Sequence, residues 1–283
     1  MILDAHTHLF PPRVRQDPAR YATPAEPVYS AMYGTPNART VDAEGLIRAM
    51  DEEGVDRAVT FGFPWSSEDT ARMHNDYVLE AQTRYAGRIT GLACFDPLKP
   101  WAEREAERAL DAGLRGLGEL AVYTAGFDDP ALARLAALGG LCRERDLPLV
   151  VHVNEPIGHD YPGKAPLTIR EIYALVRALP RTRLVLAHWG GGLFFFQTLK
   201  KQVPEALAGV YFDTAASPFL YRPQVYDLAF RILGPDKVLF GSDYPLIKPG
   251  RYFREMEEAG LSADALRMIK GDAAAAVFRF DNT

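Results

Sequence analysis

The sequence has little of what defines several classes of protein. Only two cysteines, Cys94 and Cys142, occur among 283 residues, so neither a disulfide framework nor a cysteine-rich zinc site is expected. No apolar run approaches the ~20 residues of a membrane-spanning helix, and no basic tract is present. A formal charge of −5 gives no general attraction to nucleic acid or to anionic membranes. We therefore expect a small-molecule substrate as the partner.

The chain also lacks signs of targeting or of division into domains. It begins with strand-like sequence and shows no basic-then-apolar leader, so we expect a cytoplasmic protein. No linker or low-complexity tract divides it, and we expect a single domain over residues 1–283. The oligomeric state stays open, with a homo-oligomer as one option.

Strand-like and helix-like segments alternate along the whole chain. The expected strands cover residues 2–9, 55–62, 89–95, 113–120, 147–153, 183–188, 210–214 and 237–242. The expected helices cover residues 42–54, 69–85, 102–112, 130–145, 168–179, 193–202, 223–233 and 262–278. Such alternation indicates parallel strands with right-handed crossovers, and eight strands close a barrel. The predicted fold is therefore α/β, a (β/α)8 TIM barrel.

A long segment after the first strand, residues 10–40, is rich in proline and aromatic residues. Loops of this length in compact domains are usually functional or disordered, and Tyr21, Tyr29 and Tyr33 argue against disorder. We expect an ordered loop that caps the barrel mouth, with packing on the outer surface as the alternative.

The first strand carries the strongest chemical signal. Successive side chains of a strand point to opposite faces, so His6 and His8 project the same way, roughly 7 Å apart. Alone, this pair is better explained by two hydrogen-bonded histidines at a strand end. The histidines stand at the carboxyl end of the strand, however, where a barrel opens onto its active site.

Further nitrogen and oxygen donors stand at the carboxyl ends of other predicted strands. Each has an ordinary alternative: His152 and His188 as buried core histidines, Asp243 as a turn cap, and Glu119 as a partner that orients a histidine. In a closed barrel, all of them would face one mouth, and their chemistry suits zinc or another divalent metal. The predicted metal ligands are His6, His8, Glu119, His152, His188 and Asp243.

Weaker candidates lie in loops near the same mouth. His159, Tyr161 and Lys164 follow the fifth strand and could contact substrate, although a solvated turn explains them equally well. Arg222, after the seventh strand, could pair with a substrate carboxylate or be a surface charge. The run Gly190-Gly191-Gly192 lacks the spacing and lysine of a phosphate-binding loop, so close packing or flexibility explains it better.

Motifs spread over the chain resemble the amidohydrolase superfamily, and within it the amidohydrolase-related branch that contains aminocarboxymuconate semialdehyde decarboxylase. The resemblance is carried by Asp4-Ala5-His6-Thr7-His8, His152, Ala187-His188-Trp189-Gly190-Gly191, Gly241-Ser242-Asp243-Tyr244-Pro245 and Ile269-Lys270-Gly271-Asp272-Ala273-Ala274. It implies a distorted TIM barrel with His6, His8, His152 and Asp243 at a metal ion. It also implies that His188 binds a second metal or acts on metal-bound water.

One departure within this resemblance concerns the fourth strand. Glu119 is similar to the strand-four glutamate that bridges two metals in the metal-dependent DNases of the superfamily. Single-metal decarboxylases of the branch generally do not rely on such a carboxylate. The number of metal ions, one or two, therefore stays open, and zinc is the expected metal although manganese, iron and cobalt suit the same ligands.

We expect a metal-dependent hydrolase that attacks a lactone, ester or amide with metal-bound hydroxide. Asp243 would accept and return the proton of the water, and His188 would stabilise the oxyanion or complete a second metal site. The alternative is a non-oxidative decarboxylase of an unsaturated or aromatic acid, in which His188 and Asp243 manage proton transfer to carbon. A third reading, a non-catalytic binding module, leaves six ligand-type residues at one mouth without a reason.

Overall fold

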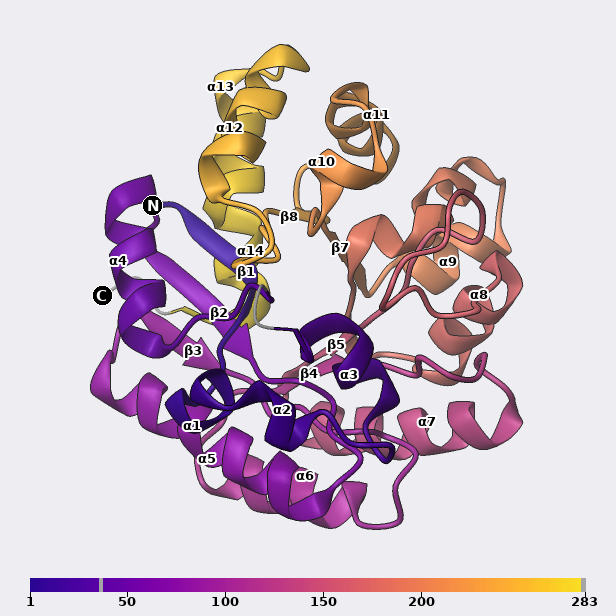
Figure 1. The fold of residues 1–283 in the computed structure, drawn as a ribbon. Coiled ribbons are helices and arrows are strands. Elements are labelled where there is room, and N and C mark those ends of the chain that lie inside the picture. Colours follow the sequence, from indigo (N-terminus) through magenta and orange to yellow (C-terminus); the bar gives the residue numbers. More distant parts are fainter. Residues whose placement is uncertain (36–37, 281–283) are drawn as a thin grey trace.

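The computed structural model describes residues 1–35 and 38–280, and in that part of the chain eight short parallel strands are surrounded by helices (Figure 1). They are β1 (Leu3–His8), β2 (Arg57–Phe61), β3 (Ile89–Gly91), β4 (Leu117–Leu120), β5 (Pro148–Val151), β6 (Arg183–Leu186), β7 (Val210–Asp213) and β8 (Val238–Leu239). All eight predicted strands are confirmed, and each is shorter than the sequence pattern indicated. The predicted TIM barrel is likewise confirmed.

The barrel is distorted, because its strands form two sheets. One sheet has the order β1-β2-β3 and the other the order β4-β5-β6-β7-β8. Single bridges join them, from Ala93 to Leu117 on one side and from Thr7 to Tyr244 on the other. The Ala5 amide also donates to the Phe240 carbonyl at 2.7 Å. The ring is therefore closed by a few contacts, and all the strands still point their carboxyl ends to one mouth.

Most of the outer helices begin and end where the sequence predicts. Asp42 caps α4 by accepting from the Gly45 amide at 2.8 Å, and Gly54 ends that helix with φ 71°. Helices α4 to α8 are α4 (Ala43–Glu53), α5 (Glu68–Arg84), α6 (Ala102–Asp111), α7 (Asp129–Glu144) and α8 (Ile169–Ala178). The later ones are α9 (Gln202–Leu207), α10 (Ser217–Leu220), α11 (Gln224–Leu233), α12 (Pro249–Glu258), α13 (Ala263–Arg267), the π-helical η2 (Met268–Asp272) and α14 (Ala273–Phe278).

The predicted helix over residues 193–202 is wrong. The segment instead forms 3₁₀ turns, η1 (His188–Thr198), before the short α9. Residues Trp189 to Gly192 have positive φ, which interrupts any helix. A side chain at Gly191 would lie 2.4 Å from the Asn154 carbonyl oxygen, so close packing explains the glycine run.

The proline-rich segment after β1 folds into three short helices, α1 (Pro12–Gln16), α2 (Pro18–Tyr21) and α3 (Pro27–Tyr33), each with proline in its first turn. Tyr29 is fully buried, and its ring centre lies 4.4 Å from that of Trp65. The Glu26 carboxylate accepts from the amides of Ser66 and Ser67 at 2.9 Å each. These contacts hold the segment against the loop after β2.

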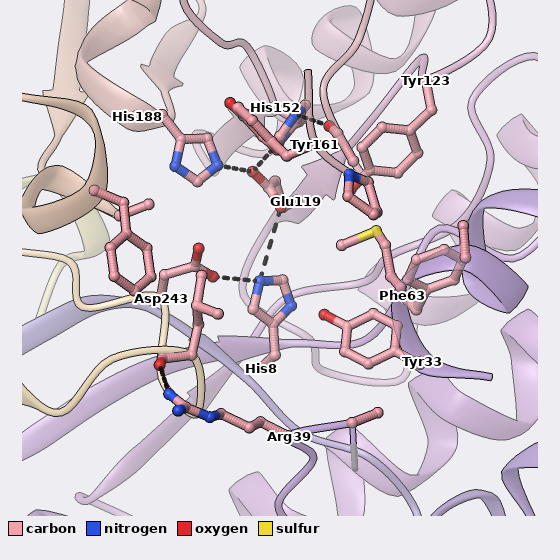
Figure 2. Close-up of a pocket in the computed structure, with 18 of the residues that line it drawn as sticks. His8, Tyr33, Arg39, Phe63, Glu119, Tyr123, His152, Tyr161, His188 and Asp243 are labelled. Atoms are coloured by element: carbon pink, nitrogen blue, oxygen red, sulfur yellow. Dashed lines mark hydrogen bonds and ion pairs between the residues drawn. The ribbon is translucent and has the colours of Figure 1, made fainter. Parts of the chain in front are cut away.

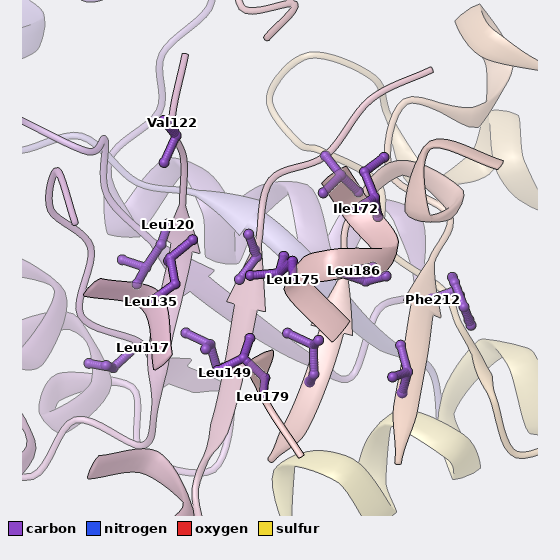
Figure 3. Close-up of a cluster of buried hydrophobic side chains, with 14 of the residues drawn as sticks. Leu117, Leu120, Val122, Leu135, Leu149, Ile172, Leu175, Leu179, Leu186 and Phe212 are labelled. Atoms are coloured by element: carbon purple, nitrogen blue, oxygen red, sulfur yellow. The ribbon is translucent and has the colours of Figure 1, made fainter. Parts of the chain in front are cut away.

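The core lies between the strands and the outer helices. Leucines and valines of β4, β5 and β6 pack against α7 and α8, through residues such as Leu149, Leu175 and Leu186 (Figure 3). Both cysteines are buried free thiols. Among the described residues, we find no helix with the length and hydropathy to cross a membrane.

The last helix closes the end of the barrel opposite to the mouth. At its carboxyl end, the Val277 carbonyl accepts from Arg183, the first residue of β6, at 2.9 Å. Arg57, the first residue of β2, lies over the Phe280 ring at 5.1 Å. The amino ends of two distant strands are thus covered, which leaves the carboxyl ends for a functional site.

Candidate metal centre

Six donor side chains converge at the carboxyl ends of the strands. Figure 2 shows those that line the cavity, which are all of them except His6. They are His6 and His8 on β1, Glu119 on β4, His152 directly after β5, His188 at the start of η1 and Asp243 after β8. The structure thus brings together every residue that the sequence analysis named as a metal ligand. Three overlapping sets of three among them have ligand atoms within 4.8 Å of one another.

Glu119 stands at the centre of this cluster. One carboxylate oxygen, Oε1, lies 2.9 Å from His152 Nδ1 and 3.2 Å from His188 Nε2. The other, Oε2, lies 3.8 Å from the Nε2 atoms of both His6 and His8. Each oxygen therefore faces a different pair of histidines.

Asp243 closes the cluster on the side of β1 and β8. Its Oδ1 lies 3.1 Å from His8 Nε2 and 3.6 Å from His6 Nε2. Asp243 has φ 59° and His188 has φ 53°, a left-handed region that side chains other than glycine rarely adopt. The barrel therefore holds these two residues against a local backbone preference, a frequent property of functional positions.

In three of the histidines, Nδ1 contacts an oxygen on the side of the ring away from the cluster, and this contact orients the ring. The Nδ1–H of His6 donates to Asp213 at 2.9 Å, and that of His188 donates to the Ala215 carbonyl at 3.0 Å. His8 Nδ1 lies 3.3 Å from the Gly62 carbonyl oxygen. All three Nε2 atoms therefore face the cluster. His152 differs, because its Nδ1 faces Glu119 and its Nε2 lies 3.1 Å from the Gly163 carbonyl oxygen.

Burial of the histidines and carboxylates shifts their pKa values in one direction, and the attraction between the two kinds of group shifts them in the other. Burial alone would lower the pKa of His6, but Asp213 and Glu119 outweigh it and raise this pKa to about 10. Burial would raise the pKa of Asp243, but His8 and His6 lower it to about 2. The Glu119 pKa is likewise held well below its usual range by His152 and His6. The cluster thus keeps its carboxylates ionised while they are buried.

This donor set fits a divalent metal ion. Nitrogen and carboxylate oxygen donors lie close together, and the ring nitrogens behind them are held by acceptors, the arrangement found around metal-binding histidines. Buried carboxylates without a cation would be costly, so a bound positive charge also suits the electrostatics.

A cavity of about 630 Å³ opens from the cluster. Aromatic side chains form one wall, where Phe63 and Tyr123 are stacked with ring centres 6.3 Å apart and Tyr33 lies beside Phe63 (Figure 2). The segment after β1 contributes Met32, Tyr33 and Arg39, which confirms that it caps the mouth. The cavity therefore suits a flat apolar molecule with polar groups at its metal-facing end.

The predicted substrate-contact residues divide into two groups. His159 and Tyr161 line the cavity. Lys164 is not among the described residues that line the cavity. It pairs with Glu155 at 3.2 Å and donates to the His159 carbonyl at 3.0 Å, and these contacts stabilise the conformation of the loop. Arg222 is also not among the described lining residues. Its predicted contact with a substrate carboxylate has no support in this geometry.

Sequence reasoning missed several residues of the site. Asp213 is fully buried at the carboxyl end of β7, the position that singled out the other ligands, and applying the same rule to that strand would have found it. Tyr33, Arg39, Phe63 and Tyr123 line the cavity from loops and a short helix, where no periodic pattern marks them.

The sequence profile of the family described as Amidohydrolase matches residues 3–280. The chain belongs to this family. A comparison with curated proteins found no significant sequence match. The amidohydrolase assignment therefore rests on the family profile and agrees with the resemblance drawn from the motifs.

Solved structures share the fold of this amidohydrolase over its full length. The 5-carboxyvanillate decarboxylase from Sphingomonas paucimobilis is 20% identical, with a TM-score of 0.72 and 98% of both chains covered. Dihydroxybenzoic acid decarboxylase from Polaromonas sp. JS666, with bound manganese and the inhibitor 2-nitroresorcinol, is 17% identical at TM-score 0.69, covering 100% of this chain and 98% of that one. The 2,6-dihydroxybenzoate decarboxylase from Rhizobium is 17% identical at TM-score 0.67, with 99% of both chains covered.

These structures correct two expectations from the sequence. The predicted hydrolase is contradicted, because the three similar structures are decarboxylases. Zinc also finds no support, because the metal named with one of them is manganese. The donor set could not decide either point, since the same nitrogen and oxygen ligands serve several metals and several reactions.

Proposed function

We propose that this amidohydrolase is a metal-dependent, non-oxidative decarboxylase of an aromatic carboxylic acid. The observation that carries the proposal is a buried cluster of six donors at the base of an aromatic-walled cavity. The decarboxylase fold shared over the full chain length supports the same reaction.

The metal would be held by His6, His8 and Asp243, whose facing atoms lie 3.1 to 3.6 Å apart, with Glu119 and the remaining two histidines beside it. Manganese is the proposed ion, because a similar structure contains it. A bound divalent cation would supply positive charge that binds the oxygens of the acid and stabilises electrons released as the bond to the carboxyl carbon breaks.

Side chains of the protein would transfer the proton that the reaction requires. In decarboxylation, the bond between ring carbon and carboxyl carbon breaks, carbon dioxide leaves, and the ring carbon keeps the electron pair and takes a proton. His188 lines the cavity and can donate the proton, and the ionised Asp243 in the same cluster favours the protonated form of His188, so we assign the transfer to these two residues together. The Ala215 carbonyl fixes the His188 ring so that Nε2 faces the cavity.

The walls would bind and orient the ring. Phe63 and Tyr123 offer aromatic faces, and the buried setting excludes water from the reacting end. We assign substrate contacts to His159 and Tyr161, which face the same cavity from the loop after β5. Arg39, at the rim, adds a cation that favours an anionic substrate.

The direct test is carbon dioxide release from 2,6-dihydroxybenzoate and 5-carboxyvanillate by protein loaded with Mn²⁺. We expect turnover of at least one aromatic acid in such a panel, and loss by about 100-fold or more in His188→Asn and Asp243→Asn. Arg222→Gln serves as a matched control because Arg222 is not a described cavity residue, and its turnover should equal that of the parent. No carbon dioxide release from any aromatic acid by metal-loaded protein would contradict the proposal.

A further inference from the structure

Asp213 is a buried acidic residue to which the proposed reaction gives no direct part. It is fully buried at the end of β7, and its two carboxylate oxygens make different contacts. Oδ2 accepts from His6 Nδ1 at 2.9 Å. Oδ1 accepts from the backbone amides of His188 at 2.9 Å and of Ala215 at 3.0 Å. One side chain thus contacts β1, at the start of the sequence, and the segments that follow β6 and β7.

The hydrogen bond to Oδ2 determines the tautomer of His6, and so which ring nitrogen has a free lone pair toward the cluster. A carboxylate can only accept, so the proton of a neutral His6 ring must sit on Nδ1. The other nitrogen, Nε2, lies 3.3 Å from His8 Nε2 and 3.6 Å from Asp243 Oδ1, inside the candidate metal centre. Asp213 therefore prepares Nε2 as a ligand.

The contact through Oδ1 acts on the second histidine by two routes. It holds the His188 backbone, which has φ 53°. It also holds the Ala215 amide, and the carbonyl of the same residue accepts from His188 Nδ1 at 3.0 Å. The His188 ring and its backbone thus both depend on the position of one carboxylate.

We propose that Asp213 is a positioning residue that sets the protonated nitrogen of His6 and the orientation of His188 together. It couples a metal ligand on β1 to the proton-transfer residue after β6. The inference rests on the proposed metal-dependent function, and it assigns Asp213 no contact with substrate.

The substitution Asp213→Asn separates the two contacts. The amide oxygen can still accept from the two backbone amides, which are fixed donors, so the amide NH₂ turns toward His6. His6 Nδ1 must then accept, and its proton moves to Nε2, the atom needed as a ligand. We expect the Kd for Mn²⁺, measured by competition with a fluorescent chelator, to rise about 10- to 100-fold.

The control removes another buried carboxylate, whose hydrogen bonds are to none of the six donors. Glu105, fully buried on α6, accepts from Asn75 at 2.9 Å and from Arg108 at 2.7 Å. Glu105→Gln should lower thermal stability while leaving the Kd for Mn²⁺ unchanged. A loss of affinity in both variants, in proportion to lost stability, would overturn the inference and make Asp213 a structural residue.

A second measurement reads the proton itself. Nitrogen-15 spectra of the zinc-loaded protein, in which zinc is a diamagnetic probe, should show His6 bound through Nε2 and protonated at Nδ1 in the parent. In Asp213→Asn they should show a His6 ring released from zinc, with its proton on Nε2. An unchanged Nδ1 proton and an unchanged Kd in the variant would overturn the inference alone. A parent protein that binds no Mn²⁺ would instead overturn the metal site together with this inference.

Discussion

His74 shows how a single buried histidine can set part of the pH dependence of stability. The Trp65 indole donates to His74 Nδ1 at 2.8 Å, and His74 Nε2–H donates to the Leu9 carbonyl at 2.6 Å. Burial lowers the pKa of His74 from 6.5 to about 4, so the folded protein holds this ring neutral. Below pH 6.5 this histidine binds a proton in the unfolded chain and stays neutral in the folded chain. The free energy of unfolding therefore falls as the pH is lowered toward 4.

The test compares the parent with His74→Gln by urea unfolding at pH 7 and pH 5. At pH 7 we expect the variant to be less stable by about 1–3 kcal/mol, because two buried hydrogen bonds are disturbed. At pH 5 the difference in the free energy of unfolding should shrink by about 2 kcal/mol, because only in the parent must a histidine lose its proton on folding. A difference that is the same at both pH values would show that His74 does not stay neutral on folding.

Glu119 offers a second prediction at the scale of one residue. Its two oxygens face two different pairs of histidines, so replacing it by glutamine removes the shared negative charge of the cluster. We expect Glu119→Gln to weaken Mn²⁺ binding at least about tenfold and to lower the metal content per chain in elemental mass spectrometry. Two ions in the parent and fewer in the variant would indicate that Glu119 bridges them. Equal metal content in both proteins would make Glu119 a structural residue.

At the scale of elements, the loop after β5 is held closed by Asn154. Its side chain accepts from the Ala165 amide at 2.7 Å and donates to the Ala165 carbonyl at 3.0 Å, which ties the two ends of the loop together. This loop carries His159 and Tyr161 into the cavity. We expect Asn154→Ala to speed amide hydrogen exchange over residues 155–164 by about 5- to 100-fold, since two buried hydrogen bonds are lost. KM for the aromatic acid should rise, with metal content unchanged.

The matched control lies a few residues further along the chain. Thr168 caps α8 by accepting from the Glu171 amide at 3.2 Å, and its hydroxyl donates to the Glu171 carboxylate at 2.6 Å, so these side-chain hydrogen bonds lie within the start of α8. Thr168→Ala should cost about 1 kcal/mol of stability and leave exchange in the loop unchanged. If amide exchange in the loop is equally fast in both variants, the hydrogen bonds of Asn154 do not hold the two ends of the loop together.

The elements themselves were predictable where periodicity and caps agree. Asp42 and Gly54 bound α4 in the sequence as they do in the structure, because capping chemistry is local. The segment after β6 could not be predicted in this way. Its apolar residues indicate a helix, whereas Gly190 must avoid Phe212 and Gly191 must avoid the Asn154 carbonyl, contacts that arise only when distant parts of the chain pack.

For the whole molecule, one geometric rule predicted most of the site. Parallel strands of a barrel end at a common mouth, so His6, Glu119 and Asp243 had to meet although they are far apart in sequence. The rule says nothing of side chains supplied by loops, such as Arg39, nor of the reaction. Hydrolysis and decarboxylation can use the same donors, and the difference lies in the shape of a cavity that forms only on folding.

Because the ligands come from both ends of the chain and the ring is closed by few contacts, metal binding should stabilise the whole barrel. An ion that binds only the folded chain adds about 2.7 kcal/mol at a concentration 100 times its Kd. We therefore expect Mn²⁺ to raise Tm by about 5–10 °C over protein treated with a chelator, as measured by calorimetry. Asp243→Asn, which removes one ligand, should lose most of this shift. Identical melting of the chelated and Mn²⁺-loaded parent would show that the cluster does not bind the ion in the folded state.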